Sequence, residues 1–239
     1  MIATIINVIL VLIGSAAGLL FKNFISDSLT SALTRALNLC VLGIGISSLT
    51  GTQDMLCVIV CMVVGTVIGH AADIERRLEG AGDFLKAKLI KGNDHSRFTE
   101  GFVTAFLLYC VGAMAITGSI EAGLNHNYKI IISKGVLDGV TSISFAATMG
   151  IGVAFSTVPM LLYQGGITLL AGWVGPYLPE AVIREMTAVG GALIVALAIN
   201  TLELGREKIK VGNMLPAMFL PIAYIPLAEW LGSLAARLL

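Results

Sequence analysis

Residues 136–174 read VLDGVTSISFAATMGIGVAFSTVPMLLYQGGITLLAGWV, and their only charged residue is Asp138. A bilayer core about 30 Å thick is crossed by roughly 20 apolar residues in a helix, so this stretch is long enough for two crossings. The segment Ser156-Thr157-Val158-Pro159 offers the only turn signal within it. We therefore predict membrane helices over 135–153 and 157–175, although the stretch leaves the exact division between them open.

The composition of the whole chain agrees with a membrane protein. Of its 239 residues, 56% are hydrophobic and 13% are charged, against about 25% charged in an ordinary soluble domain, and the mean hydropathy is +0.91. The 15 basic and 15 acidic residues cancel, so we expect the lipid bilayer as a partner and no nucleic acid. The four cysteines, Cys40, Cys57, Cys61 and Cys110, lie in apolar runs, which favours buried thiols over a disulfide framework. No metal site and no cofactor are predicted.

Scanning outward from residues 136–174, we predict an all-α bundle of about eight membrane helices in one integral membrane domain, 1–239. Pro216, Pro221 and Pro226 fall in the last helix, which should be kinked or partly unwound. The predicted spans cover residues 3–21, 36–51, 55–72, 101–119, 135–153, 157–175, 186–202 and 213–235.

The distribution of Lys and Arg over the loops predicts the orientation, because cytoplasmic loops carry an excess of both. With eight spans, three loops on one side hold most of the basic residues, and both termini lie outside. A model with one span more or fewer in the middle would largely remove this asymmetry. The predicted inside residues are Lys22, Arg35, Arg76, Arg77, Lys86, Lys88, Lys91, Arg97, Arg206, Lys208 and Lys210, and the outside ones are Lys129, Lys134, Arg184 and Arg237.

An internal repeat is also indicated. Residues 14–49 correspond to residues 165–202: each segment contains an apolar span, a short polar link and a Gly-rich span. Residues 54–71 correspond to residues 213–230. The first half would be 1–91, the linking spans 100–155 and the second half 156–239. Equivalent spans would then cross the membrane in opposite directions, an arrangement that recurs in secondary transporters with the substrate site between the halves.

Ionisable residues inside apolar spans are functional candidates because their burial in lipid is costly. Asp138 lies one helical turn after Lys134. The two could form a salt bridge at the membrane surface, or Asp138 could line a polar path with Thr141, Ser142 and Ser144. The sequence leaves both readings open.

Several uncharged polar residues are further candidates for a substrate or ion path. Gln164 precedes two glycines and suits either substrate binding or a hydrogen bond between helices. The repeat places the pair Ser47 and Ser48 at positions equivalent to Asn200 and Thr201, where the two pairs could form a pseudo-symmetric site or cap helix ends. The remaining path candidates are Asn7, Ser47, Ser48, Asn200 and Thr201.

His70 and Glu229 occupy equivalent positions in the proposed repeat. Proton coupling is one reading, because His titrates near neutral pH. Anchoring at the membrane interface is the other.

Catalytic motifs are missing: the chain has no GxxxxGK[ST], HExxH or GxSxG, so we do not expect an enzyme. The segments CVGAMAITGSIEAGL (110–124) and KGVLDGVTSISFAATMGIGV (134–153) resemble the bacterial membrane-protein family known as domain of unknown function 554, at Gly112, Gly118, Lys134, Asp138 and Gly150. The resemblance runs over essentially the whole chain. It implies a bacterial inner-membrane protein with a transport role and supplies no substrate.

Together these features predict a secondary transporter of a small solute or ion. The alternative is an ion channel, or a structural or sensory membrane protein. A channel should show a continuous polar stripe through the bundle, whereas a carrier should show an occluded polar cavity near the midplane, bounded by Gly or Pro breaks. Small-residue faces are compatible with a homodimer.

Overall fold

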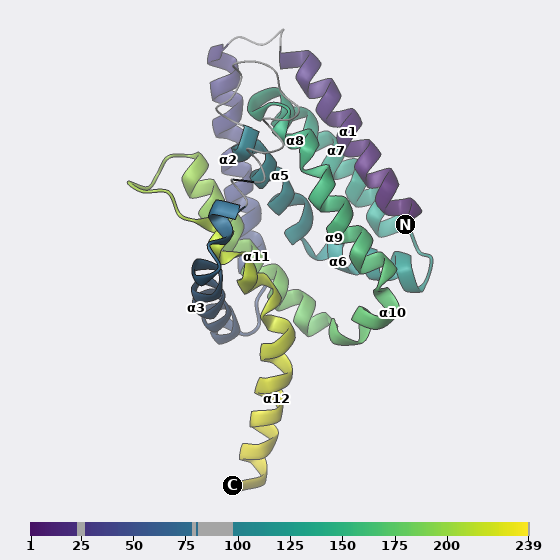
Figure 1. Cartoon of the computed structure of the whole chain (residues 1–239), viewed down its shortest axis with the longest axis vertical. Helices are drawn as coiled ribbons and strands as arrows, with labels where there is room; N and C mark the ends of the chain where they lie inside the picture. Colours follow the sequence, from purple (N-terminus) through teal and green to yellow (C-terminus); the bar gives the residue numbers. More distant parts are fainter. Residues whose placement is uncertain (23–26, 78–79, 81–97, 239) are drawn as a thin grey trace.

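The computed structural model describes residues 1–22, 27–77, 80 and 98–238, and every regular element in these ranges is a helix. The all-helical prediction is confirmed for this part of the chain. Four of the basic residues assigned to the inside, 86, 88, 91 and 97, lie outside the described residues. Figure 1 shows the arrangement of α1 (Ile2–Lys22), α2 (Asp27–Leu49), α3 (Met55–Ala71), α5 (Phe98–Val111), α6 (Ala113–Leu124), α7 (Lys129–Met149), α8 (Gly152–Phe155), α9 (Thr157–Leu169), α10 (Ala171–Val174), η1 (Gly175–Tyr177), α11 (Glu180–Thr201), η2 (Val211–Phe219) and α12 (Pro221–Leu238).

Four helices of the described chain, α1, α2, α7 and α11, are long and apolar enough to cross a membrane. Three bent pairs raise the number to seven if each pair makes one crossing: α5 with α6, α8–α9 with α10–η1, and η2 with α12. The one predicted span left over is the third, α3, an apolar helix of 17 residues, which is shorter than the roughly 20 residues a bilayer needs. The count of eight therefore remains a prediction.

The break between the fifth and sixth predicted spans lies earlier than the sequence suggested. Helix α7 ends at Gly150, whose φ of +82° is easily adopted only by glycine. The expected turn around Ser156 and Pro159 does not break the direction of the chain, because Gly152–Leu169 continues as one helical unit. Pro159 lies in the first turn of α9, where a backbone N–H has no helical partner to lose.

The last predicted span is kinked, as its prolines predict. Residues Val211–Phe219 form a 3₁₀ helix that contains Pro216, and the chain bends by 46° before α12. Figure 1 shows α12 projecting away from the rest of the bundle. The α5–α6 pair bends by 58° around Gly112.

Glycines set the closest helix contacts and reveal the helix directions. A Cβ on Gly14 would meet the carbonyl oxygen of Gly139, and one on Gly18 would meet that of Ile143. Because the residue numbers rise together, α1 and α7 run parallel. Small residues at such contacts let helix backbones approach closely in a membrane.

Two other helix pairs run antiparallel. A Cβ on Gly45 would lie 2.9 Å from the Val195 nitrogen, and one on Gly191 would lie 2.6 Å from the Leu49 nitrogen, so α2 and α11 have opposite directions. Helix α3 likewise runs against η2, since Gly65 faces Ala217 and Gly69 faces Asn213.

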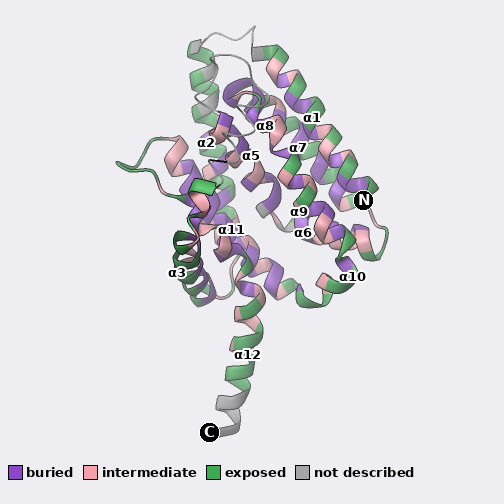
Figure 2. Ribbon diagram, in the orientation of Figure 1, coloured by how far each residue is buried: buried purple, intermediate pink, exposed green. Residues whose placement is uncertain are grey.

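The outer faces of the bundle are apolar, whereas polar side chains lie within it. Figure 2 shows buried residues facing inward along α1, α7, α9 and α11, with α3 and α12 largely exposed. Exposed side chains on α1 and α3 include Ile9, Ile13, Val63 and Val67. This inverted pattern is typical of a helix bundle surrounded by lipid.

Candidate functional site

The close approach of α1 and α7 brings polar side chains together inside the bundle. A Cβ on Gly135 would lie 3.1 Å from the Asn7 Cα, so glycine at this position lets α1 lie directly against α7. Asn7 is fully buried, and the polar face of α7 continues from Lys134 to Asp138 and Ser142 at intervals of one turn.

Four side chains form what we call the central polar cluster: Asn7, Lys134, Asp138 and Gln164. The Lys134 ammonium donates to Oδ2 of Asp138, and Asn7 Nδ2 donates to the same oxygen at 3.4 Å and to Gln164 Oε1 at 3.0 Å. Lys134 is 4% exposed and Asp138 is 8% exposed. The Lys134–Asp138 ion pair considered from the sequence therefore exists, but it is enclosed by helices and does not lie on the surface of the bundle. Three helices, α1, α7 and α9, contribute to the cluster.

Hydroxyl groups extend the cluster on both sides. Ser142 Oγ donates to the Asp138 carbonyl oxygen, so the Tyr109 hydroxyl must be the donor in its 2.7 Å bond to Ser142 Oγ. The Lys134 ammonium lies 5.7 Å from the centre of the Tyr109 ring, within range of a cation–π interaction. On the other side, Thr4 and Thr168 form a 3.4 Å hydrogen bond between α1 and α9.

Two predicted path residues on α7 do not join this cluster. The Thr141 hydroxyl donates to the Leu137 carbonyl of its own helix, and Ser144 is exposed. Ser144 lies six residues after Asp138, which turns it to another face of α7, whereas Thr141, three residues after Asp138, uses its hydroxyl within its own helix.

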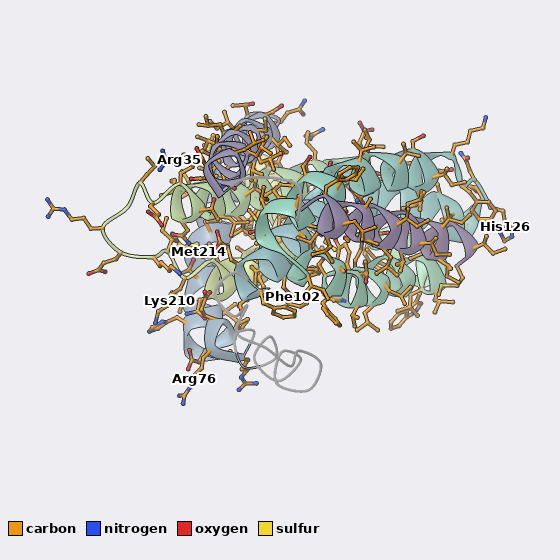
Figure 3. All side chains as sticks on the ribbon, turned by 90° about the horizontal axis from the view of Figure 1, so that it is seen from above. Arg35, Arg76, Phe102, His126, Lys210 and Met214 are labelled. Atoms are coloured by element: carbon orange, nitrogen blue, oxygen red, sulfur yellow. The ribbon has the colours of Figure 1, made fainter. Side chains whose placement is uncertain are left out.

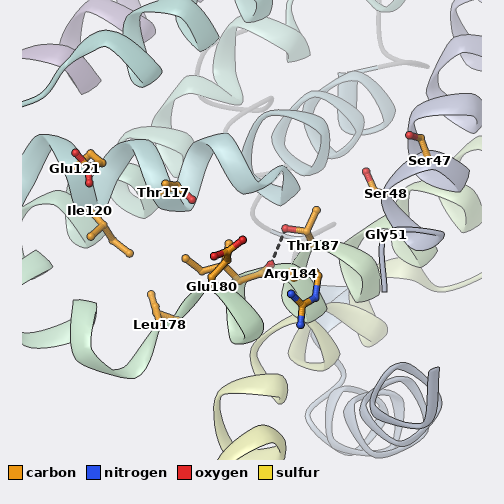
Figure 4. A pocket seen from close by; sticks show the side chains of 11 residues that line it. Ser47, Ser48, Gly51, Thr117, Ile120, Glu121, Leu178, Glu180, Arg184 and Thr187 are labelled. Atoms are coloured by element: carbon orange, nitrogen blue, oxygen red, sulfur yellow. Dashed lines mark hydrogen bonds between the residues drawn. The ribbon is translucent and has the colours of Figure 1, made fainter. Parts of the chain in front are cut away.

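Ser47 and Ser48 line a separate pocket of about 670 Å³ between α2, α6 and α11. Figure 4 shows them on one side, with Thr117 and Glu121 of α6 opposite and the start of α11 between. The pocket contains carboxylates, a guanidinium and hydroxyl groups, a mixture that suits a polar solute. Its lining residues are Ser47, Ser48, Gly51, Thr117, Ile120, Glu121, Leu178, Glu180, Ile183, Arg184 and Thr187.

Asn200 and Thr201, the repeat equivalents of those serines, lie at the other end of the antiparallel α2–α11 pair. The Asn200 side chain bonds to both the nitrogen and the carbonyl oxygen of Ile209 at 2.8 Å, and so closes the loop after α11. Thr201 donates to its own helix, and its carbonyl oxygen accepts from Asn38 at 3.5 Å. The structure does not bring the two pairs into one site.

His70 and Glu229, the other pair related by the repeat, are not brought together either. Both are exposed. Because α3 runs against η2, with Gly69 opposite Asn213, His70 lies near the start of η2, whereas Glu229 lies on the part of α12 that projects beyond the bundle.

A second buried carboxylate, Glu185, was not among the predicted site residues. It is 1% exposed and accepts from Thr52 Oγ1 at 2.5 Å and from the Gln53 nitrogen at 3.0 Å. These bonds hold the α2–α3 connection against α11. The predicted span began at 186, which left Glu185 in a loop. Its helical spacing from the apolar residues Val182 and Val189 was the signal that could have placed it on the inward face.

Comparison with known proteins adds the family. The family model described as "Protein of unknown function (DUF554)" matches residues 2–225, nearly the whole chain. The chain belongs to the DUF554 family. The resemblance seen in the sequence is thereby confirmed.

Two relatives of this DUF554 chain match it over nearly its whole length, and their names give no role. "Uncharacterized membrane protein YdfK" of Bacillus subtilis is 32% identical over 225 residues, covering 92% of this chain and 94% of the relative. "Uncharacterized protein YqgA" of Escherichia coli K12 is 27% identical over 220 residues, covering 90% and 92%.

One more distant match has a named activity. "Fluoride-specific ion channel FluC" of Granulibacter bethesdensis is 28% identical over 96 residues, which are 40% of this chain and 63% of that protein. No solved structure matches the chain.

Proposed function

We propose that this DUF554 protein is a secondary transporter of a small solute or ion, and not an enzyme. The central polar cluster is the observation that carries the proposal. A Lys–Asp pair and two amides from three helices are buried in a bundle whose outer faces are apolar. Polar and ionisable groups in a membrane interior are costly and typically mark a substrate or ion pathway.

An enclosed site with apolar packing beside it favours a carrier. Val11 follows Asn7 by one turn of α1, Phe145 lies beyond Ser142 on α7, and both belong to the main apolar core with Met160. The polar face is therefore interrupted on its way through the bundle. Helix breaks of the kind expected for a carrier occur in two of the surrounding elements, at Gly112 between α5 and α6 and at Gly150 after α7.

An ion channel is the second candidate, favoured by the match to the fluoride channel over 96 residues. Under this alternative the same cluster would form part of a permeation path. The two candidates differ in rate and in saturation of the flux.

The helix directions support eight alternating crossings, with α3 as a short span. The first and fifth spans, α1 and α7, should run parallel, as they do. An odd-numbered span and an even-numbered span should run antiparallel. The contacts agree for α2 with α11, for α3 with η2, and for α1 with α9, where Thr4 meets Thr168 and Asn7 meets Gln164.

These antiparallel pairs also support the inverted repeat. Each of them joins a span of the first half to its proposed equivalent in the second half: first with sixth, second with seventh, third with eighth. Two halves related by a pseudo-twofold axis in the membrane plane would pack equivalent helices against each other in this way.

For the orientation, we propose an inner-membrane protein with both termini outside. Figure 3 places Arg35, Arg76 and Lys210 toward one end of the molecule and His126 at the opposite end. These three residues, all assigned to the inside, thus share one end. Cysteine labelling at positions 91 and 127 should report opposite faces, and labelling from a single side would contradict eight spans.

A homodimer remains a prediction that mass measurement in nanodiscs can test.

The transport proposal is tested with the purified full-length chain in proteoliposomes. A panel of fluoride, chloride, nitrate, sodium, potassium, manganese and alanine is offered, and uptake is measured for each. We expect saturable uptake of at least one solute, lost in Gln164→Ala and kept in the control Thr141→Ala. Uptake that equals that of empty liposomes for every solute would refute transport. A linear, very fast flux would favour the channel.

A further inference from the structure

The hydrogen-bond directions in the central polar cluster follow from one carboxylate. The Asp138 carboxylate can only accept, so Asn7 must turn its Nδ2 toward it. The same Nδ2 then donates to Gln164 Oε1. Turning either amide over would set two oxygens or two amide nitrogens against each other, so the orientation of both amides is fixed.

This arrangement leaves Gln164 with an unused donor group. Gln164 is 0% exposed, and its Nε2 has no hydrogen-bond partner among the described residues. Asn7 Oδ1 is also without a hydrogen-bond partner among the described residues. The Lys134 ammonium carries three N–H groups, and one of them reaches Asp138. Gln164 Nε2 and the Lys134 ammonium therefore retain N–H groups that a ligand accepting hydrogen bonds could use.

Charge balance restricts that ligand further. Lys134 and Asp138 form a neutral pair, so an anion entering alone would leave an uncompensated charge in a medium of low dielectric constant. A proton that binds Asp138 cancels this charge and frees Lys134 to face the anion. The total charge of the site is then zero both before and after loading.

The surroundings of the pair suit this exchange. Lys134 on the same helix and Tyr109 and Cys110 on α5 are the titratable groups that face Asp138 in the described chain, whereas α1 and α9 contribute the amides of Asn7 and Gln164. The Tyr109 ring keeps an attractive face toward the Lys134 ammonium when Asp138 is protonated. The ring itself is held by its bond to Ser142.

We propose that the central polar cluster binds a small inorganic anion together with one proton, with Lys134 and Gln164 as ligands of the anion and Asp138 as the proton acceptor. The proton comes from water on one side of the membrane and leaves to the other side when the anion is released. No covalent bond other than that to the proton changes. This inference rests on the transport function proposed above and gives it a substrate class and a coupling ion.

The test measures proton and anion movement together. Proteoliposomes that contain a pH-sensitive dye receive an inward gradient of each anion of the panel, with the membrane potential clamped by potassium and valinomycin. We expect the interior to acidify in step with anion uptake, at one proton per anion and independently of the clamped potential. Anion uptake without acidification, or uptake that follows the potential, would overturn the coupling and leave the transport proposal intact.

Variants separate the roles of the residues. Asp138→Asn replaces the carboxylate with an amide of the same shape that cannot take up the proton, and should abolish anion-driven acidification. Gln164→Leu should weaken anion uptake at least about tenfold, the effect of losing one hydrogen bond to a charged group. Thr141→Ala should match the wild type in both measurements.

Folding and substrate class are controlled separately. Each variant is compared with the wild type by size-exclusion chromatography. If Asp138→Asn is not monodisperse, anion uptake by the wild type is measured at pH 5.5 and at pH 8.0 instead. We expect faster uptake at the lower pH. Uptake of cations or alanine but of no anion would refute the anion site and preserve transport. No uptake of any solute would refute the transport function itself.

Discussion

Asp138 and Glu185 are two buried carboxylates of one bundle, and they are stabilised in different ways. Asp138 lies against a lysine on its own helix and an amide on α1. Glu185 is held by a hydroxyl and a backbone N–H of the α2–α3 connection, and its basic neighbour Arg184, with a side chain 32% exposed, reaches it at 3.4 Å. The partner of Asp138 is a flexible cation, whereas the main partners of Glu185 are neutral groups fixed in the backbone or close to it.

This difference indicates different roles. A carboxylate held by neutral donors fixes one position of the chain, so Glu185 fastens α11 to the end of α2. A carboxylate paired with a lysine can exchange that partner for a proton, and the lysine can then bind something else. Burial alone does not distinguish the two residues, but the nature of the partners does.

The largest effect should come from removing one member of the ion pair. Asp138→Leu leaves Lys134 charged and unpaired inside the bundle, and we expect the free energy of unfolding to fall by about 3–5 kcal/mol. Denaturation by SDS in mixed micelles, followed by circular dichroism, measures the change.

The double variant Lys134→Met with Asp138→Leu is the matched control. It removes both charges and should recover most of the lost stability, although not transport. A single variant as stable as the wild type would show that Lys134 is not confined by the helices around it.

A smaller effect is expected from separating α1 from α7. Gly14→Ala places a Cβ against the carbonyl oxygen of Gly139, and overpacking of this kind costs about 1–3 kcal/mol. Because Asn7 reaches Asp138 from α1, uptake should fall as well. Gly43→Ala on α2, where a Cβ meets nothing within 4 Å, should leave both unchanged or slightly raise stability. Equal behaviour of the two variants in the same denaturation assay would contradict the close contact.

Glu185→Gln should be milder than Asp138→Leu. The amide retains one acceptor for the Gln53 nitrogen or the Thr52 hydroxyl but loses the charge, so we expect a loss of about 1–2 kcal/mol. Uptake in proteoliposomes should stay within about twofold of the wild type. A complete loss of uptake in a stable Glu185→Gln protein would place Glu185 in the transport path and remove the contrast with Asp138.

The smallest effect should follow Tyr109→Phe. This variant keeps the ring beside Lys134 and removes the hydroxyl that donates to Ser142, at a cost of about 0.5–1.5 kcal/mol. Ser142→Ala in the same background should add little, because the two groups share one bond. Thermal unfolding of the single and double variants in detergent gives this coupling directly.

From the amino-acid sequence alone, the class of the protein and the positions of most of its helices could be predicted. Apolar runs of bilayer length predict membrane helices, because a helix pairs its own backbone groups and lipid offers them no hydrogen bond. The prolines of the last predicted span correctly predicted its kink. The family could be recognised from two segments of the chain. The pairing of Lys134 with Asp138 could also be anticipated, since residues four apart on a helix face each other.

Which polar residues meet depends on how the helices pack, and the sequence did not show it. Asn7 and Gln164 join Asp138 because glycines let α1 and α7 touch and α9 crosses α1, and these contacts depend on packing between distant segments. The break at Gly150 and the burial of Glu185 were missed for a related reason. A positive φ and an inward-facing carboxylate each depend on what surrounds the residue, and in an apolar sequence nearly every face of a helix reads alike until its neighbours are in place.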